Sequence, residues 1–264
     1  MSMEITIQDR VTKNATFWNF KGEVDYVDEW FLMRSPVPIM LILMGYWSFV
    51  LKIGPEYMNF KAAYNLRKLL AIYNIAQIAL SCYLCYIGTK VMWAYGVIPS
   101  SCHMEDKTEK LLITSSAYLY FFAKVTELLD TIFFVLRKNF RQVTFLHVYH
   151  HSIMLMATWT TLKYEPSYNT VFVGTINSYV HVIMYTYYYL SAFPELSKYL
   201  WWKKYITKMQ ITQFILIILQ AVACHFFSGC PPSYTLLIFT VFNAFLFTGL
   251  FMNFYLQSYK KKVN

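Results

Sequence analysis

The stretch Phe145-Leu146-His147-Val148-Tyr149-His150-His151 places three imidazoles within five residues. It opens an apolar run of about residues 145–162, which otherwise reads as buried helix. Positions i, i+3 and i+4 fall on one face of an α-helix. A buried imidazole without a partner costs roughly a few kcal/mol, and histidine acts readily as base, acid, nucleophile or metal ligand near neutral pH. The stretch therefore predicts a chemical site on one face of a helix.

The composition indicates an integral membrane protein. The chain has 264 residues, of which 57% are hydrophobic, 20% are aromatic and only 14% are charged, against about 25% charged in a soluble domain. The net charge of +9 does not favour nucleic-acid binding, because the bases form short clusters between apolar runs, as in cytoplasmic membrane loops. The polar and acidic first thirty residues predict no cleavable signal peptide.

Hydrophobic runs long enough to cross a bilayer predict an all-α, polytopic membrane protein with seven transmembrane helices. We expect a lumenal tail at 1–34, a seven-helix domain at 35–257 and a cytosolic tail at 258–264. The predicted spans are at about residues 36–51, 69–92, 111–136, 145–162, 168–193, 205–227 and 234–255.

The loop charges predict how these spans are oriented. More Lys and Arg lie in the C-terminal tail and after the first, third and fifth spans than on the other side, which makes the C-terminus cytosolic and the N-terminus lumenal. The sequon Asn14-Ala15-Thr16 would then lie on the glycosylated side. The ending Lys261-Lys262-Val263-Asn264 has the form of a dilysine retrieval signal for the endoplasmic reticulum, although a basic stop-transfer cluster looks similar.

Two cysteines, Cys102 and Cys230, fall in the predicted lumenal loops, where oxidation is permitted. We predict that they form a disulfide that ties the second-to-third connection to the sixth-to-seventh. The alternative is two free loop thiols, because the sequence does not fix their Cα separation. The Cys82-x-x-Cys85 pair lies within a span without a partner pair and is only a weak redox or metal signal.

Polar side chains inside four spans lie at one level, towards the cytosol. Ionisable groups within spans are functional candidates, although Lys124 and Glu127 alone would also fit a structural ion pair. Together they predict one enclosed polar site that opens to the cytosol, with an apolar chamber towards the lumen. The bases around its mouth (Arg137, Lys138, Arg141, Lys203, Lys204) suit phosphates or simply reflect the topology. The residues at this level are Lys124, Glu127, Asp130, Thr131, His147, His150, His151, Asn177, His181, Tyr185, Tyr188, Thr207, Gln210 and Gln213.

These residues form four boxes that resemble the signature boxes of the very-long-chain fatty acid elongases. They occur in order and at sensible distances, and the resemblance covers roughly residues 30–264. The histidine box reads His-Val-Tyr-His-His rather than His-Trp-Tyr-His-His. This difference disfavours the branch of the family that acts on shorter saturated chains. The boxes begin at Lys124, His147, Asn177 and Thr207.

The resemblance implies a reaction and a fold. It implies condensation of a long-chain acyl-CoA with malonyl-CoA to 3-oxoacyl-CoA, CO2 and CoA, without a cofactor or a metal. It also implies seven helices, six of them an inverted barrel around a narrow tunnel, with a lumenal disulfide. Expected partners are the lipid bilayer, the ketoacyl reductase, dehydratase and enoyl reductase of the elongation cycle, and a second copy of the chain, with no nucleic acid.

Residue roles follow as hypotheses. No cysteine lies at the polar level, so we expect His150 or His181 to accept the acyl chain. His147 and His151 would position groups or move protons. The carboxylates Glu127 and Asp130 would orient imidazoles, and Lys124 and Asn177 would stabilise an oxyanion. Gln210, Gln213, Tyr185 and Tyr188 would line the channel, and Arg137 and Lys204 would bind substrate.

Two other function classes compete with this interpretation. A histidine-ligated membrane oxygenase or desaturase needs about eight imidazoles, whereas His103 and His225 lie towards the lumen, which leaves four, enough for one metal at most. A seven-helix receptor or transporter would spread its polar groups along a path rather than gather them at one level.

Overall fold

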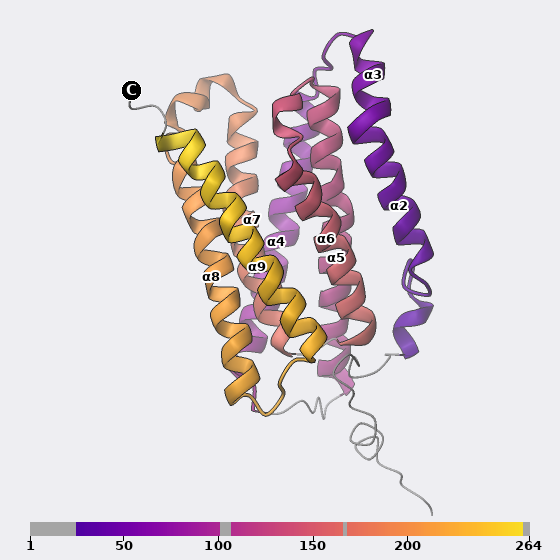
Figure 1. The fold of residues 1–264 in the computed structure, drawn as a ribbon, viewed down its shortest axis with the longest axis vertical. Coiled ribbons are helices and arrows are strands. Elements are labelled where there is room, and N and C mark those ends of the chain that lie inside the picture. Colours follow the sequence, from indigo (N-terminus) through magenta and orange to yellow (C-terminus); the bar gives the residue numbers. More distant parts are fainter. Residues whose placement is uncertain (1–24, 101–106, 166–167, 261–264) are drawn as a thin grey trace, which may run out of the picture.

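The computed structural model describes residues 25–100, 107–165 and 168–260. All its regular structure in these ranges is helical, without a strand. The short elements are η1 (Asp25–Glu29), η3 (Phe140–Gln142), η4 (Pro194–Tyr199) and η5 (Leu256–Lys260). The long helices are α4 (Arg67–Tyr95), α5 (Lys107–Leu136), α6 (Phe145–Tyr164), α7 (Tyr168–Ser191), α8 (Lys203–Phe227) and α9 (Tyr234–Tyr255), which stand side by side (Figure 1).

The first rod is longer than predicted. α2 (Val37–Ser48) passes through a π-helical turn, η2 (Phe49–Ile53), into α3 (Gly54–Asn59). The predicted end at residue 51 is therefore wrong. Pro55 lies in the first turn of α3, where its missing N–H is tolerated, and the π turn before it lets the rod continue.

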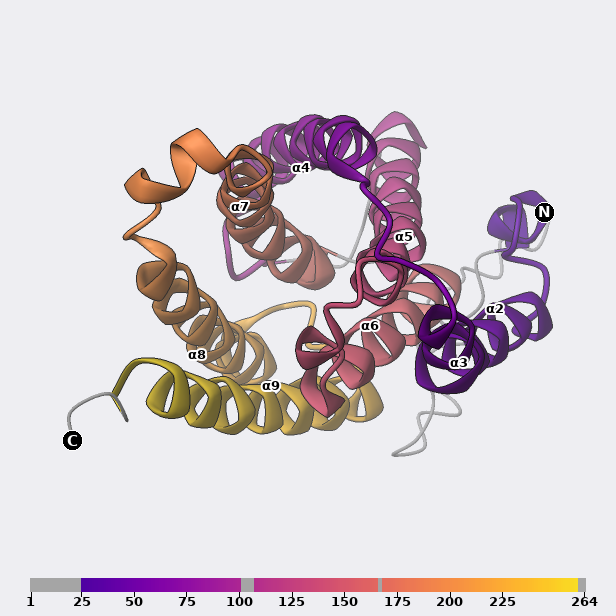
Figure 2. The ribbon, with the colours of Figure 1, turned by 90° about the horizontal axis from the view of Figure 1, so that it is seen from above.

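The long helices form a ring when seen from above (Figure 2). Its order is α4, α5, α6, α9, α8 and α7, and each neighbouring pair is in contact, including α7 with α4. α2 and α3 lie outside this ring, against α5 and α6. The ring therefore surrounds an interior that every one of its helices can line.

Within the described ranges, four segments are long and apolar enough to cross a membrane: Val37–Asn59, Arg67–Tyr95, Lys203–Phe227 and Tyr234–Tyr259. Their outer faces are rich in exposed apolar side chains, such as Phe242 and Phe245 of α9, which a lipid environment explains. The protein is thus a multi-pass membrane protein. The number of seven spans stays a prediction, because α5, α6 and α7 carry the polar side chains.

Part of the predicted N-terminal tail packs on the bundle. Val27 and Met33 are fully buried against α2, α5 and α6. The indole of Trp159 donates to the carbonyl of Leu32 at 2.9 Å, and buried Lys163 forms an ion pair with Asp28. The tail from Asp25 onward therefore anchors the end of α6 that lies away from the histidines.

Of the two cysteines predicted to form a disulfide, the structure describes only Cys230. Cys230 is disulfide-bonded, whereas Cys82, Cys85 and Cys224 are free thiols. Cys102, Asn14 and Lys261–Asn264 lie outside the described residues, so the pairing with Cys102, the sequon and the dilysine ending stay predictions.

Candidate active site

Local capping brings the histidine stretch next to the polar end of α5. Thr144 caps α6, and its side chain accepts the N–H of His147 at 3.2 Å, so the histidines begin in the first helical turn. Beyond the last residue of α5, Lys138 has a φ of 57°, and the N–H of Asn139 donates to the carbonyl of Phe134 at 2.8 Å, as in a Schellman ending. This tight ending makes the connection short.

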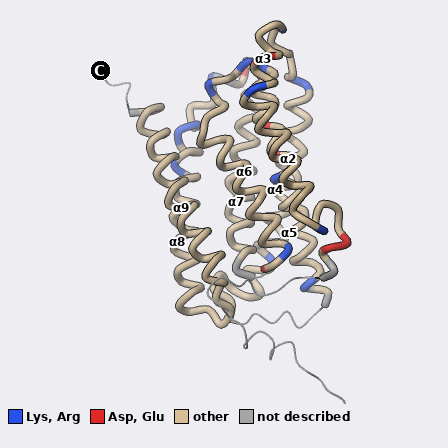
Figure 3. Tube along the Cα trace, turned by 45° about the vertical axis from the view of Figure 1, so that its right-hand side comes forward, with Lys and Arg blue, Asp and Glu red and all other residues tan. Residues whose placement is uncertain are grey.

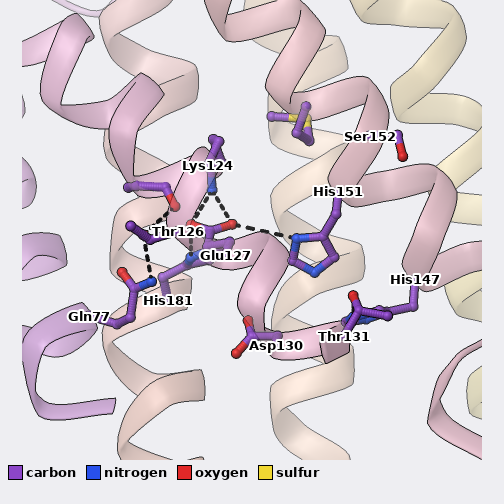
Figure 4. Close-up of polar contacts among 12 residues, drawn as sticks. Gln77, Lys124, Thr126, Glu127, Asp130, Thr131, His147, His151, Ser152 and His181 are labelled. Carbon is purple, nitrogen blue, oxygen red and sulfur yellow. Dashed lines mark hydrogen bonds and ion pairs between the residues drawn. The ribbon is translucent and has the colours of Figure 1, made fainter. Parts of the chain in front are cut away.

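Glu127 is the centre of the buried polar cluster (Figure 4). Its carboxylate oxygens accept from the ammonium of Lys124 at 2.8 and 3.0 Å. Nδ1 of His181 lies 3.2 Å from Oε1, at hydrogen-bonding distance, and Nδ1 of His151 lies 4.0 Å from Oε2. Because Glu127 is only 1% exposed, these partners compensate the cost of burying its charge.

Asn177 of α7 has a fixed amide orientation. Its Oδ1 accepts from Nζ of Lys124 and from the hydroxyl of Tyr120, both at 2.8 Å. Two donors on one atom identify it as the oxygen, so the NH2 group is the opposite end. No described residue accepts from this NH2 group, and Asn177 lines both cavities described below. Its amide can therefore donate to a bound carbonyl or carboxylate oxygen.

A wide cavity of about 970 Å³ opens at the end of the bundle that carries α3. Figure 3 shows that Lys and Arg gather at this end. The floor carries His147, His150, His151 and His181. The basic side chains along it, well suited to phosphates, are Arg67, Arg137, Arg141 and Lys203. We call it the basic cavity.

A second, apolar cavity of about 190 Å³ lies deeper inside the ring. Four hydroxyls of its wall are already engaged, because Ser116, Thr158, Thr175 and Ser178 each donate to a backbone carbonyl of their own helix. The residues shared by the basic and the apolar cavity are His150, Asn177, Gln213 and Phe214. A polar group, His150, thus lies where the basic cavity meets the apolar cavity.

Among the histidines of the site, His150 has only ring contacts and no hydrogen bond or carboxylate contact to a described residue. Its ring packs against Phe247 at a centroid distance of 4.9 Å and against His151 at 5.5 Å. No hydrogen bond joins it to any described residue, whereas His147 is bonded to Thr131 and His181 lies beside Glu127. Of the two predicted acyl acceptors, His150 lines both cavities and His181 lines only the basic one.

Three of the predicted residues have contacts that differ from those expected. Asp130 accepts from the hydroxyl of Tyr185 at 2.7 Å rather than from an imidazole. Tyr185 is fully buried and lines neither cavity, so it is not part of the channel wall. Lys124 lines neither cavity either, and its three N–H groups are taken by Glu127 and Asn177, which leaves no donor for an oxyanion.

Most of the other residues predicted to bind substrate line one of the two cavities. Tyr188, Gln210 and Arg137 line the basic cavity. Gln213 lines both cavities, and its Oε1 is buried without a described partner. Lys204 lines neither cavity, and its ammonium lies over the ring of Tyr205 at 5.2 Å. The neighbouring Lys203, rather than Lys204, lines the basic cavity.

Sequence reasoning missed three residues that lie outside the four boxes. Asn74 of α4 is 3% exposed and lines the basic cavity. Tyr120 holds the oxygen of Asn177, and Tyr46 of α2 bonds Thr131 at 2.7 Å. The available signal for Asn74 was a lone amide within an apolar run, whereas a tyrosine in such a run carries no signal of its own.

The imidazoles do not converge on a point. Among the described residues, no three His, Cys, Asp or Glu side chains form a group that could hold a metal ion. The ring of His181 instead lies beside the carboxylate of Glu127, and the ring of His147 is bonded to the hydroxyl of Thr131.

Known proteins resemble the chain over most of its length. The family model described as ELO, GNS1/SUR4 family, matches residues 31–264. Very long chain fatty acid elongase 2 of Mus musculus is 40% identical over 256 residues, which are 94% of this chain and 85% of the relative. Very long chain fatty acid elongase 7 of Rattus norvegicus is 37% identical over 264 residues, covering 97% and 94%. With its histidines gathered inside a ring of membrane helices, the chain therefore belongs to the GNS1/SUR4 family of fatty acid elongases.

Proposed function

We propose that this protein catalyses the condensing step of very-long-chain fatty acid elongation. The substrates are a long-chain acyl-CoA and malonyl-CoA, and the products are 3-oxoacyl-CoA, CO2 and CoA. The observation that carries the proposal is the position of His150 at the junction of the basic and the apolar cavity. The basic cavity suits the phosphates of CoA, and the apolar cavity suits the acyl chain.

The first stage is acyl transfer to His150. A ring nitrogen attacks the thioester carbonyl carbon, a C–N bond forms and the C–S bond breaks. The ring loses one proton, and CoA leaves with that proton as the thiol. The NH2 group of Asn177, which has no protein acceptor among the described residues, is placed to donate to the oxyanion that develops at the carbonyl.

The second stage is decarboxylation and carbon–carbon bond formation. Malonyl-CoA binds in the basic cavity, its C–CO2 bond breaks, and the electron pair stays on the α-carbon. This carbon attacks the acyl-imidazole, the C–N bond breaks, and the ring takes one proton from the cavity, which balances the lost carboxylate charge. Glu127 holds Nδ1 of His181, so Nε2 of that ring is the nitrogen available to exchange protons.

The setting of the reaction is part of the proposal. The seven helices would span the endoplasmic reticulum membrane, with the ring as an inverted barrel, the N-terminus in the lumen and the C-terminus in the cytosol. We propose no cofactor beyond the two CoA substrates, and we expect the reductases and the dehydratase of the elongation cycle, and a second copy of the chain, as partners. The basic cavity would then face the cytosol, where positive charge is retained.

Incubation of the purified protein with acyl-CoA and labelled malonyl-CoA tests the activity. We expect a labelled 3-oxoacyl-CoA two carbons longer than the acyl substrate, with one CO2 released for each product molecule. Release of CO2 without a chain-extended product, or no reaction across a panel of acyl chain lengths, would contradict the proposed function.

A further inference from the structure

A chain of hydrogen bonds joins α2, outside the ring, to the histidines inside it. The hydroxyl of Tyr46 in α2 lies 2.7 Å from Oγ1 of Thr131 in α5. The same Oγ1 lies 2.9 Å from Nε2 of His147 in α6. Tyr46 is 5% exposed and Thr131 is 0% exposed, so each proton along this chain needs an acceptor within the protein.

Thr131 differs from other threonines of the bundle. Thr114, Thr158 and Thr175 donate their hydroxyl protons to backbone carbonyls of their own helices, the usual solution for threonine in a helix. Within the described ranges, no backbone carbonyl accepts from Thr131, so its proton goes either to Tyr46 or to His147.

The phenol decides between the two directions. In the described part of the chain, Thr131 is the sole hydrogen-bond partner of the Tyr46 hydroxyl, and Tyr46 lines neither cavity. If Thr131 donated to Tyr46, the phenol proton would be buried without an acceptor, at a cost of about 1–3 kcal/mol. If Tyr46 donates to Thr131 and Thr131 donates to His147, every proton is used.

We propose that Tyr46 and Thr131 fix the tautomer of His147, with Nε2 as the acceptor and the proton on Nδ1. Tyr46 is then a positioning residue that acts through Thr131, and α2 contributes to the site although it lies outside the ring. His147 lines the basic cavity. Since Nε2 is occupied, Nδ1–H is the group that this ring offers to a molecule there, namely as a hydrogen-bond donor to a carbonyl or carboxylate oxygen.

This inference rests on the proposed function for its consequence, because the oxygen would belong to a thioester or to the malonyl carboxylate. It also gives different roles to the rings of His147 and His181, although both carry their proton on Nδ1. Glu127 lies at Nδ1 of His181, which leaves Nε2 as an acceptor, whereas Thr131 lies at Nε2 of His147, which leaves Nδ1–H as a donor. One ring suits proton uptake, and the other suits oxygen binding.

Nitrogen-15 NMR of the full chain, labelled on histidine and purified in detergent, tests the relay without substrate. Subtraction of a His147→Gln spectrum assigns the two nitrogens of His147. We expect a protonated Nδ1 and an unprotonated Nε2. In Tyr46→Phe, Thr131 is free to donate to its own helix backbone and to accept from His147, so the Nε2-protonated form should gain population.

Kinetics of the same proteins give the second readout. Tyr46→Phe should lower kcat roughly five- to tenfold, the equivalent of one hydrogen bond, without changing KM for acyl-CoA. Thr131→Val should lower kcat at least as much, and Thr131→Ser, which keeps the hydroxyl, should retain it. Tyr57→Phe is the matched control. It removes a hydroxyl from the same rod, but the hydrogen-bond partner of this hydroxyl is the exposed Tyr64.

A protonated Nε2 on His147 in the unmodified protein would overturn the proposal, and so would a Tyr46→Phe variant with unchanged spectrum and unchanged kcat. If the unmodified protein formed no condensation product, the proposed function would fail, while the spectrum would still decide the direction of the relay.

Discussion

Oε1 of Glu127 in α5 lies 3.2 Å from Nδ1 of His181 in α7, while the same carboxylate holds the ammonium of Lys124. One buried anion therefore does two things. It compensates a buried cation, and it determines which nitrogen of His181 is left for a substrate. Its loss should affect both the stability of the fold and the chemistry, and the two effects can be separated.

Glu127→Gln should leave Lys124 buried without a counter-charge. We expect a loss of about 3–5 kcal/mol in the free energy of unfolding, seen as a lower Tm in detergent. The double variant Lys124→Met with Glu127→Gln removes both charges and should recover much of the Tm. It should remain inactive, because His181 no longer has its carboxylate. A single variant as stable as the unmodified protein would contradict the ion pair.

His150→Ala should abolish condensation while the protein remains folded, because the ring at the junction of the two cavities is the proposed acyl acceptor. We expect a drop of at least about a thousandfold in product formation. His225→Ala is the matched control, since His225 lies near the far end of α8 against Tyr234. Equal activity of the two variants would remove His150 from the mechanism.

Arg137→Gln should weaken the binding of CoA substrates. Arg137 lines the basic cavity, and a hydrogen bond to a charged group contributes about 1.5–3 kcal/mol. We expect KM for malonyl-CoA to rise about tenfold or more, with a small change in kcat, in steady-state assays at low salt. Lys204→Gln serves as the control, because Lys204 lines neither cavity. Equal effects of the two substitutions would argue for a general charge effect.

Ala221→Phe should shorten the acyl chains that the protein extends. Ala221 is 6% exposed and lines the apolar cavity, whereas the next residue, Val222, is 40% exposed and does not line it. Competition between acyl-CoAs of increasing length should therefore show a shift to shorter chains for Ala221→Phe and no shift for Val222→Phe. The same preference in both variants would place the chain elsewhere.

Gly88→Ala should loosen the contact between α4 and α7. A Cβ at Gly88 would lie 1.8 Å from Oγ1 of Thr175, whereas a Cβ at Gly45 of α2 meets nothing within 4 Å. We expect Gly88→Ala to cost about 1–3 kcal/mol and to lower the Tm, while Gly45→Ala leaves it unchanged or raises it. If both substitutions were neutral, α4 and α7 would pack less closely than the structure has them.

The sequence predicts the helices and the level of the polar site, because hydropathy and the spacing of histidines act over short distances along the chain. It does not predict which groups pair across helices. Glu127 and Asp130 are three residues apart, hence about 60° apart around the helix, and the structure places one beside His181 and the other beside Tyr185. Tyr46, 85 residues from Thr131, carries no local signal of its contact.

The end of the first rod shows the same limit. The basic and proline-containing residues after Leu51 suggested a loop, yet the helix continues through η2 to Asn59. A π turn resolves the backbone geometry that Pro55 imposes, and α3 packs back against α5. Tertiary contact thus overrides the local composition.

Intact-protein and peptide mass spectrometry after mixing with acyl-CoA alone tests directly whether His150 carries the acyl group. We expect free CoA to be released and the protein to gain the mass of one acyl group. This group should map to His150 and disappear on addition of malonyl-CoA, with formation of the 3-oxoacyl product. An active protein that shows no acyl adduct and releases CoA only when both substrates are present would contradict the acyl-imidazole mechanism.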